Sequence, residues 1–139
     1  MEIGPGGDIS VSAEIRKTVF VGEQGIPLED EMDEYDAIAW HIVLCEDGVP
    51  VGSGRIYMED GAAVLGRVAV LKEKRRQGYA TMICRELIKV ARREKATLVT
   101  LHSQSYAAEL YDKLGFVRVG EAFLEEGIEH IRMDLILGK

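Results

Sequence analysis

The sequence predicts an α/β (α+β) fold in which helices cover both faces of a mixed, mostly antiparallel sheet. Three observations support this prediction. Short turns at Glu46-Asp47-Gly48 and Asp60-Gly61 separate apolar segments, a pattern typical of antiparallel hairpins. In the middle of the chain a strand, an amphipathic helix and a second strand follow one another, which predicts a parallel pair joined by a crossover. The last two strands favour antiparallel pairing again.

The first third of the chain predicts one helix and a long loop. Val11, Ile15 and Val19 recur at i, i+4 and i+8, which is the spacing of one helix face, so we expect a helix over residues 11–20. Residues 22–36 contain glycine, proline and many carboxylates, and they predict a loop with room for one short helical turn.

The central segments alternate strands with one long helix. Strands are expected over residues 38–45, 49–57 and 62–71. A helix is expected over residues 78–95, with a buried apolar stripe and charge on the opposite face. This stripe consists of Ala80, Ile83, Cys84, Leu87, Ile88 and Ala91. Residues 97–102 form a continuous strand, which favours cover on both faces.

The C-terminal part predicts a short helix followed by two strands. The helix spans about residues 105–114 and ends at Gly115, since glycine suits the backbone conformation that follows a helix. Residues 116–119 and 128–135 complete the sheet, and apolar and polar residues alternate in the last strand.

Length and composition predict one domain spanning residues 1–139, with 47% apolar and 29% charged residues. The sequence lacks a secretory leader pattern and any apolar run of the roughly 20 residues that a membrane helix needs. We expect Cys45 and Cys84 to be free, buried thiols, with a disulfide as the alternative, and free thiols indicate a reducing, cytoplasmic compartment. No membrane partner is expected, because no apolar run is long enough. No metal is expected, because each histidine stands alone without a second ligand at metal spacing.

Positive charge is concentrated in one segment of an acidic chain. The net charge is −7, yet residues 72–95 hold nine basic and three acidic side chains, which gives +6 there and −13 for the rest. A nucleic-acid-binding protein usually presents a broad basic face. One basic element in an acidic body suits a compact anionic ligand better than a duplex, so no nucleic-acid partner is expected.

The basic turn before the long helix has the features of a phosphate site. The first amides of a helix lack internal partners, and the helix dipole favours an anion there. Gly78 would let the backbone approach a phosphate, Thr81 could add a hydroxyl donor, and Arg75 and Arg76 supply charge. A solvated charged turn is the alternative, because the spacing matches neither the P-loop nor the dinucleotide-binding fingerprint.

Two motifs in the expected elements resemble signatures of the GNAT N-acetyltransferase superfamily. Arg75-Arg76-Gln77-Gly78-Tyr79-Ala80 matches the acetyl-CoA signature Q/R-x-x-G-x-G/A, directly after the strand GRVAVL. The run from Ala107 to Phe116 matches a second signature, A-x-x-L/F-Y-x-K-x-G-F. The stretches VFVGEQGIP, DAIAWHIVL, LHSQ and FLEEGIEHIRM further resemble the ElaA/YjcF-like branch. The resemblance covers Val19 to Leu135, whereas residues 1–10 have no clear counterpart of the usual first strand.

The resemblance implies the GNAT fold, acetyl-CoA as cosubstrate and an amine as acceptor. The diphosphate of CoA would lie on the basic turn, and its pantetheine arm would pair with the preceding strand. Tyr111 would protonate the departing thiolate, and a strand amide would stabilise the oxyanion. Gln104 stands where the family often has Asn. The implied CoA-binding residues are Val68, Ala69, Val70, Arg75, Arg76, Gln77, Gly78, Tyr79, Ala80, Thr81 and Gln104.

The acceptor end of the site is less sharply predicted. His102 ends the strand beside the expected slot and is our candidate base, and a water chain is the alternative. Six carboxylates in residues 29–36 form either a solvated loop or a border that attracts a cationic amine. Arg55, Arg67 and Glu125-Glu126 are further candidates to face the acceptor, but their strand parity leaves the choice open.

The predicted reaction is transfer of acetyl from acetyl-CoA to a primary amine of a small molecule or peptide, by direct attack in a ternary complex. A non-catalytic CoA-binding sensor or interaction module is the alternative. The sequence leaves the oligomeric state open, with a homodimer as one alternative.

Overall fold

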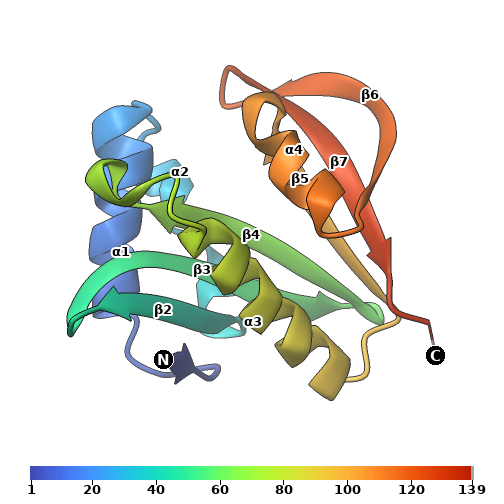
Figure 1. Ribbon diagram of the computed structural model, residues 1–139, viewed down its shortest axis with the longest axis horizontal. Coiled ribbons are helices and arrows are strands. Elements are labelled where there is room, and N and C mark those ends of the chain that lie inside the picture. The colour runs from blue at the N-terminus through green and yellow to red at the C-terminus, as the bar shows by residue number, and fades with distance from the viewer. Residues whose placement is uncertain (139) are drawn as a thin grey trace.

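A seven-stranded sheet forms the centre of the molecule (Figure 1). The computed structural model describes residues 1–138, apart from the side chain of Asp30. The strand order is β1-β2-β3-β4-β5-β7-β6, in which β4 and β5 are parallel and all other neighbours are antiparallel. The predicted mixed, mostly antiparallel sheet with a parallel crossover is confirmed. The strands are β1 (Glu2–Ile3), β2 (Trp40–Glu46), β3 (Val49–Glu59), β4 (Ala62–Val70), β5 (Leu98–Gln104), β6 (Val117–Glu125) and β7 (Ile128–Ile136).

Helices cover both faces of this sheet, as predicted. The side chains of α3 and α4 pack into one core on one face, and α1 with its continuation η1 packs on the other face (Figure 1). The α-helices are α1 (Ser10–Arg16), α2 (Leu28–Glu31), α3 (Tyr79–Arg93) and α4 (Ala108–Lys113). A π-helix, η1 (Lys17–Glu23), and three 3₁₀ turns, η2 (Glu34–Ala37), η3 (Lys72–Lys74) and η4 (Ser105–Ala107), complete the set.

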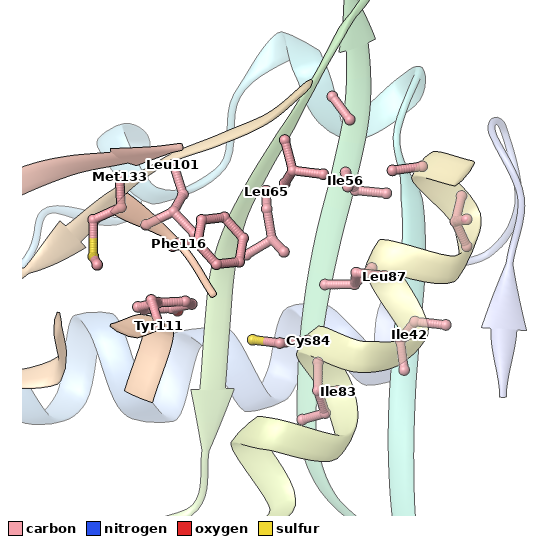
Figure 2. Packing of buried hydrophobic residues seen from close by; sticks show 14 of the residues in the cluster. Ile42, Ile56, Leu65, Ile83, Cys84, Leu87, Leu101, Tyr111, Phe116 and Met133 are labelled. Carbon is pink, nitrogen blue, oxygen red and sulfur yellow. The ribbon is translucent and has the colours of Figure 1, made fainter. Parts of the chain in front are cut away.

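The larger core lies between α3, α4 and the sheet (Figure 2). The predicted stripe of α3 is confirmed: Ile83, Cys84 and Leu87 are fully buried, and they face Ile56 and other apolar residues of the strands. Burial of one such aliphatic side chain contributes about 1.5–3 kcal/mol to folding. This core fixes α3, and therefore fixes the basic turn from which α3 begins.

Several sequence-based boundaries are wrong. The N-terminal segment does contain a strand, but β1 is only two residues long and pairs with β2 at the edge of the sheet. The strand expected at 116–119 continues to Glu125. Residues 22–36 hold two short helical segments, α2 and η2, rather than one. Cys45 is free as expected but exposed rather than buried, whereas Cys84 is free and buried.

The expectation that β5 is covered on both faces is also wrong. Val99, Leu101 and Ser103 are buried against the core that α3 and α4 share with the sheet, whereas His102 is 51% exposed and Gln104 is half-buried on the other face. That other face borders a cavity instead of a packed layer.

Two irregularities of β4 create the space for a site. β4 and β5 pair only from Ala62 to Val64, opposite Leu98 to Thr100, and beyond these residues the strands separate. In addition, the register between β3 and β4 shifts between Ser53 and Arg55, and Arg67 at this β-bulge has a left-handed φ of 52°. The edge of β4 that faces β5 is therefore without a strand partner after Val64.

Among residues 1–138, none of the helices combines the length and the apolar character that a membrane-spanning helix requires.

Candidate active site

A cavity of about 590 Å³ lies where β4 and β5 separate. Its walls come from both faces of the sheet. Leu65 and Tyr111 belong to the core on the α3/α4 side. Arg55 and Asp33, which form an ion pair, belong to the opposite side. The cavity therefore passes through the sheet. A ligand could enter from the α3 side and meet a second ligand that enters from the other side.

Eight of the thirteen residues predicted from the sequence line this cavity. Val68, Ala69 and Val70 provide the unpaired stretch of β4, as expected for main-chain pairing with an extended ligand. The other five that line the cavity are Arg75, Ala80, His102, Gln104 and Tyr111. Residues far apart in the sequence are thus brought together as the two motifs predicted.

The remaining predicted residues form the turn and the first turn of α3. Arg76, Gln77, Gly78, Tyr79 and Thr81 lie outside the cavity lining. Both Arg76 (φ 64°) and Gly78 (φ 81°) adopt the left-handed conformation. Within the described part of the chain, no group accepts a hydrogen bond from the amides of residues 77–81, which leaves these donors free for an anion.

The side chain of Tyr79 has a structural role. Its hydroxyl donates a hydrogen bond to Glu46 in the β2–β3 hairpin, and Lys74 Nζ contacts the other oxygen of the same carboxylate at 2.5 Å. These contacts anchor the start of α3 against the sheet. Only the main-chain amide of Tyr79 is available for the predicted ligand contact.

The C-terminal end of the π-helix η1 contacts Arg75, which follows β4, and Gln104, the last residue of β5. Arg75 donates to both oxygens of Glu23 at 2.7 and 3.0 Å, and to the carbonyl oxygen of Val70 at 3.0 Å. The side-chain amide of Gln24 donates to Oε1 of Gln104 at 3.1 Å, and the side-chain amide of Gln104 donates to Oε1 of Gln24 at 2.8 Å. Glu23 and Gln24 therefore link the ends of β4 and β5 across the cavity, which the sequence did not predict.

Tyr111 lies deep in the wall of the cavity beside α3. Its ring is 7% exposed and packs edge-on against Phe116 at 5.7 Å, and Cys84 lies beside it (Figure 2). Burial, together with contact with the Cys84 thiol, raises the pKa of the Tyr111 phenol well above its usual value. Tyr111 therefore keeps its proton at neutral pH and can give it to a base stronger than itself.

Carboxylates and tyrosines line the opposite end of the cavity. Tyr35 and Tyr57 stack with ring centroids 4.4 Å apart, and Asp33 follows α2 close to them. Glu125 and Glu126 border this end from the β6–β7 hairpin. Arg55 and Arg67 also line it, so all the candidates whose strand parity was undecided reach the cavity.

The interpretation of residues 29–36 as a solvated loop is wrong for two of their carboxylates, which are buried. Glu31 and Asp36 are 2% and 8% exposed and pair with Arg16, which is 1% exposed. Arg55 pairs with Asp36 and Asp33 at 3.0 and 2.6 Å. The acidic run is therefore part of a buried ion network that holds α2 and η2 against α1 and β3.

Arginine contacts lower the pKa of two aspartates in this network, Asp33 and Asp36. Burial alone would raise the pKa of Asp36, but hydrogen bonds and charges, first from Arg16 and then from Arg55, lower it to about 2. Burial opposes the ionisation of Asp33 as well, and its contacts with Arg55 and then Arg67 lower its pKa nevertheless. Both carboxylates are thus charged at neutral pH, and their charge is matched by arginine.

The three histidines have different environments. His41 is fully buried, its Nε2 lies 3.1 Å from the carbonyl oxygen of Asp36, and burial lowers its pKa. His102 lines the cavity and contacts Glu125 through Nδ1 at 2.9 Å. His130 also lines the cavity and is 7% exposed. Sequence reasoning chose His102 over His130, and the pairing of His130 with Gln104 that brings it to the cavity is visible only in the structure.

Comparison with known proteins shows the family to which the chain belongs. The sequence model of the acetyltransferase (GNAT) domain family matches residues 20–137. The chain is 39% identical over 120 residues to the uncharacterized N-acetyltransferase YjcF of Bacillus subtilis, and the aligned region covers 86% of each chain. Among solved structures, an acyl-CoA N-acyltransferase from Pseudomonas aeruginosa superposes with a TM-score of 0.78 at 30% identity, covering 88% of this chain and 85% of the other. Escherichia coli ElaA superposes with a TM-score of 0.78 at 28% identity, covering 87% and 84%.

The chain therefore belongs to the GNAT acetyltransferase family, within its ElaA/YjcF-like branch. Its fold is the GNAT fold, and its class is that of an acyltransferase.

Proposed function

We propose that the protein transfers acetyl from acetyl-CoA to a primary amine of a small-molecule or peptide acceptor, by direct attack in a ternary complex. The observation that carries the proposal is the cavity that passes through the sheet between β4 and β5. A passage of this kind lets a thioester and an amine approach the same point from opposite faces, without an intermediate on the enzyme.

The α3 end of the passage fits the donor. The free amides of residues 77–81 and the α3 dipole would hold the diphosphate, with charge from Arg76. The unpaired edge of β4 from Val68 to Val70 would bind the amide-containing arm as an added strand. An acyl-CoA donor is also named for the related acyltransferase from Pseudomonas aeruginosa.

The opposite end fits a cationic acceptor. Glu125 and Glu126 carry no arginine or lysine partner in the described part of the chain, so negative charge remains in the cavity that Tyr35 and Tyr57 also line. The guanidinium of Arg55 already lies 5.4 Å from the centre of the Tyr57 ring. Carboxylates and aromatic rings both attract ammonium groups. The bound ammonium must lose a proton before it attacks, and His102 is the proposed acceptor of that proton.

Attack of the neutral amine on the thioester carbon forms a tetrahedral oxyanion, which a main-chain N–H of β4 would stabilise. When the carbon–sulfur bond breaks, the thiolate takes the proton of the Tyr111 hydroxyl. The buried phenol remains protonated until the thiolate appears, so its proton is present when the thiolate forms.

Replacement of Tyr111 by Phe tests the proposal. Phe keeps the ring that packs against Phe116 and removes only the hydroxyl. Thiol release from acetyl-CoA, measured with a panel of primary amines, is expected to slow by about 10²-fold, the usual contribution of a general acid. Acetyl-CoA affinity by calorimetry and the urea midpoint serve as controls and are expected to change little.

Unchanged turnover of Tyr111→Phe would remove Tyr111 from the mechanism. Tight binding of acetyl-CoA by the wild-type protein without transfer to any amine of the panel would instead indicate the sensor alternative.

A further inference from the structure

A cluster of two imidazoles, one carboxylate and one aromatic ring lies on the acceptor face of β5, β7 and β6. The sheet register brings these residues together: His130 pairs with Gln104 of β5 and with Phe123 of β6. His102 lies two positions before Gln104, and Glu125 two positions after Phe123, so all four side chains share one face. These three strands lie side by side in Figure 1.

Glu125 contacts the two histidines with different oxygens. Its Oε1 lies 2.9 Å from His102 Nδ1, and its Oε2 lies 3.9 Å from His130 Nε2. Phe123 separates the two rings: it meets His102 edge-on at 5.0 Å and stacks on His130 at 6.1 Å. Glu125 is thus the polar group that joins an otherwise aromatic cluster.

The hydrogen bond to Glu125 defines the proton positions of His102. A carboxylate can only accept, so His102 Nδ1 carries a proton and donates it to Glu125. In the neutral ring Nε2 then keeps its lone pair. No residue of the described chain bonds this Nε2, and His102 lines the cavity. The ring therefore presents a proton acceptor that is not engaged elsewhere.

His130 is held in a different way. Its Nδ1 donates to the carbonyl oxygen of Ile128 at 2.7 Å, and the ring is 7% exposed. The backbone fixes this ring without help from Glu125. By contrast, His102 is 51% exposed, and its contacts are Glu125 and the edge of Phe123. The orientation of His102 thus depends on Glu125, whereas that of His130 does not.

We propose that Glu125 is a positioning residue: it fixes the tautomer and orientation of His102, so that His102 Nε2 takes the proton from the acceptor amine. This proposal rests on the proposed function and extends it to the proton path. In the step, one N–H bond of the ammonium breaks, a bond forms between that proton and Nε2, and the amine keeps the electron pair for its attack. The positive charge of the resulting imidazolium is offset by the carboxylate of Glu125, and the proton then passes to water.

Nuclear magnetic resonance of the free enzyme tests the positioning alone. Long-range ¹H–¹⁵N correlations of the imidazoles report which ring nitrogen carries the proton. We expect the Nδ1–H tautomer for His102 in the wild-type protein and a shift toward the other tautomer in Glu125→Gln. Glu129→Gln is the matched control, because Glu129 is exposed on the same hairpin and is absent from the cavity lining. A wild-type His102 protonated on Nε2 at neutral pH would overturn the proposal.

Steady-state kinetics tests the consequence for catalysis. We expect kcat to fall by about 10²-fold in His102→Gln and by about 10-fold in Glu125→Gln, within the range of general-base effects. The KM for acetyl-CoA should stay within twofold of wild type in both variants, whereas the KM for the amine should rise in Glu125→Gln, because this variant also removes a negative charge at the acceptor end. The double variant should be no slower than His102→Gln, because the two residues act as one unit. Glu129→Gln should retain kcat within a few-fold, and His130→Gln should lose less activity than His102→Gln.

Additive losses in the double variant, or a loss in His130→Gln that exceeds the loss in His102→Gln, would contradict the assignment. The two parts of the experiment also separate the two proposals. If the wild-type protein acetylates no amine, the proposed function fails, and the tautomer of His102 then decides the positioning role by itself.

Discussion

Replacement of Asp36 by Asn should change how the stability of the protein depends on pH. Asp36 is 8% exposed and accepts hydrogen bonds from Arg16 at 2.6 and 3.2 Å and from Arg55 at 3.0 Å. These contacts lower its pKa from the ordinary value of 3.8 to about 2. Because the folded-state pKa is depressed, the stabilisation is fully present above the unfolded-state pKa and is lost as the pH falls through the folded-state value.

The size of the effect follows from the shift. A difference of about 1.8 pH units at 1.36 kcal/mol per unit corresponds to about 2 kcal/mol of unfolding free energy. About 1 kcal/mol of this is lost by pH 3, and the full amount only below pH 2. At neutral pH, Asp36→Asn should cost about 3 kcal/mol, because two buried arginines each lose a charged partner.

Urea unfolding followed by circular dichroism, repeated between pH 7 and pH 3, measures the prediction. The stability advantage of wild type over Asp36→Asn should shrink by about 1 kcal/mol over this range. Carboxylates outside this ion network titrate alike in both proteins and cancel in the difference. Asp47→Asn, a change at an exposed turn residue, is the matched control and should differ little from wild type. A difference between wild type and Asp36→Asn that stays constant with pH would refute the reasoning about the ion network.

Two further predictions concern the core. Gly54→Ala should lower the unfolding free energy by about 1–3 kcal/mol, because its Cβ would lie 2.8 Å from the Ile83 side chain of α3. Gly66→Ala, whose Cβ would meet nothing within 4 Å, should have a small effect, and equal losses in urea titrations would contradict the packing argument. The exposed Cys45 should react quickly with a thiol reagent in the folded protein, whereas Cys84 should react only in denaturant, because burial raises its pKa to about 12. Fast reaction of two thiols in native conditions would contradict that prediction.

The sequence predicted the architecture well where local pattern and tertiary packing agree. The stripe of α3 has the helical period and is buried as expected. The two signature motifs predicted correctly that Gly78 lies at the start of α3 and Tyr111 in α4, because each motif has a fixed place relative to a strand and a helix. Such features need only a few neighbouring residues to be recognised.

The alternation of side chains between the two faces of β4 did not predict the face on which Arg67 lies, and the reason is physical. Ala63 and Leu65 point into the core, so simple alternation would place Arg67 there as well. The β-bulge adds one residue and reverses the phase, so Val68 now packs against the core and Arg67 turns to Glu31. A bulge has no reliable signal in a single sequence, so the position of Arg67 at the cavity could not be predicted.

The C-terminal half of β6 was missed because an edge strand lacks a buried face. Nearly all of its residues are exposed, and Gly120, with a φ of 75°, accompanies a register shift between Val119 and Phe123. Neither alternation nor continuity of apolar residues therefore marks the strand. Glu125 lies at its end, so its pairing with His102 could be found only in three dimensions.

Arg16 did carry a usable signal. It lies within the buried stripe of α1 and η1 that runs Ser12, Ile15, Arg16, Val19 and Phe20, at i, i+3, i+4, i+7 and i+8. A charge in the middle of an apolar helix face requires buried partners of opposite sign. The nearby acidic run could have supplied them, and this argument would have favoured a buried ion network over a solvated loop.

Three departures from regular structure lie around one place in the molecule. The π-helix η1, the bulge at Arg67 and the early end of the β4–β5 ladder all border the same cavity. Each of them costs regular hydrogen bonds or backbone freedom that an ideal sheet and helix would keep. A fold selected for stability alone would close the gap between β4 and β5 and continue their pairing. The gap is instead held open by a core on the α3 side and by an arginine–carboxylate network on the other side, which is the arrangement expected where two substrates must meet inside a sheet.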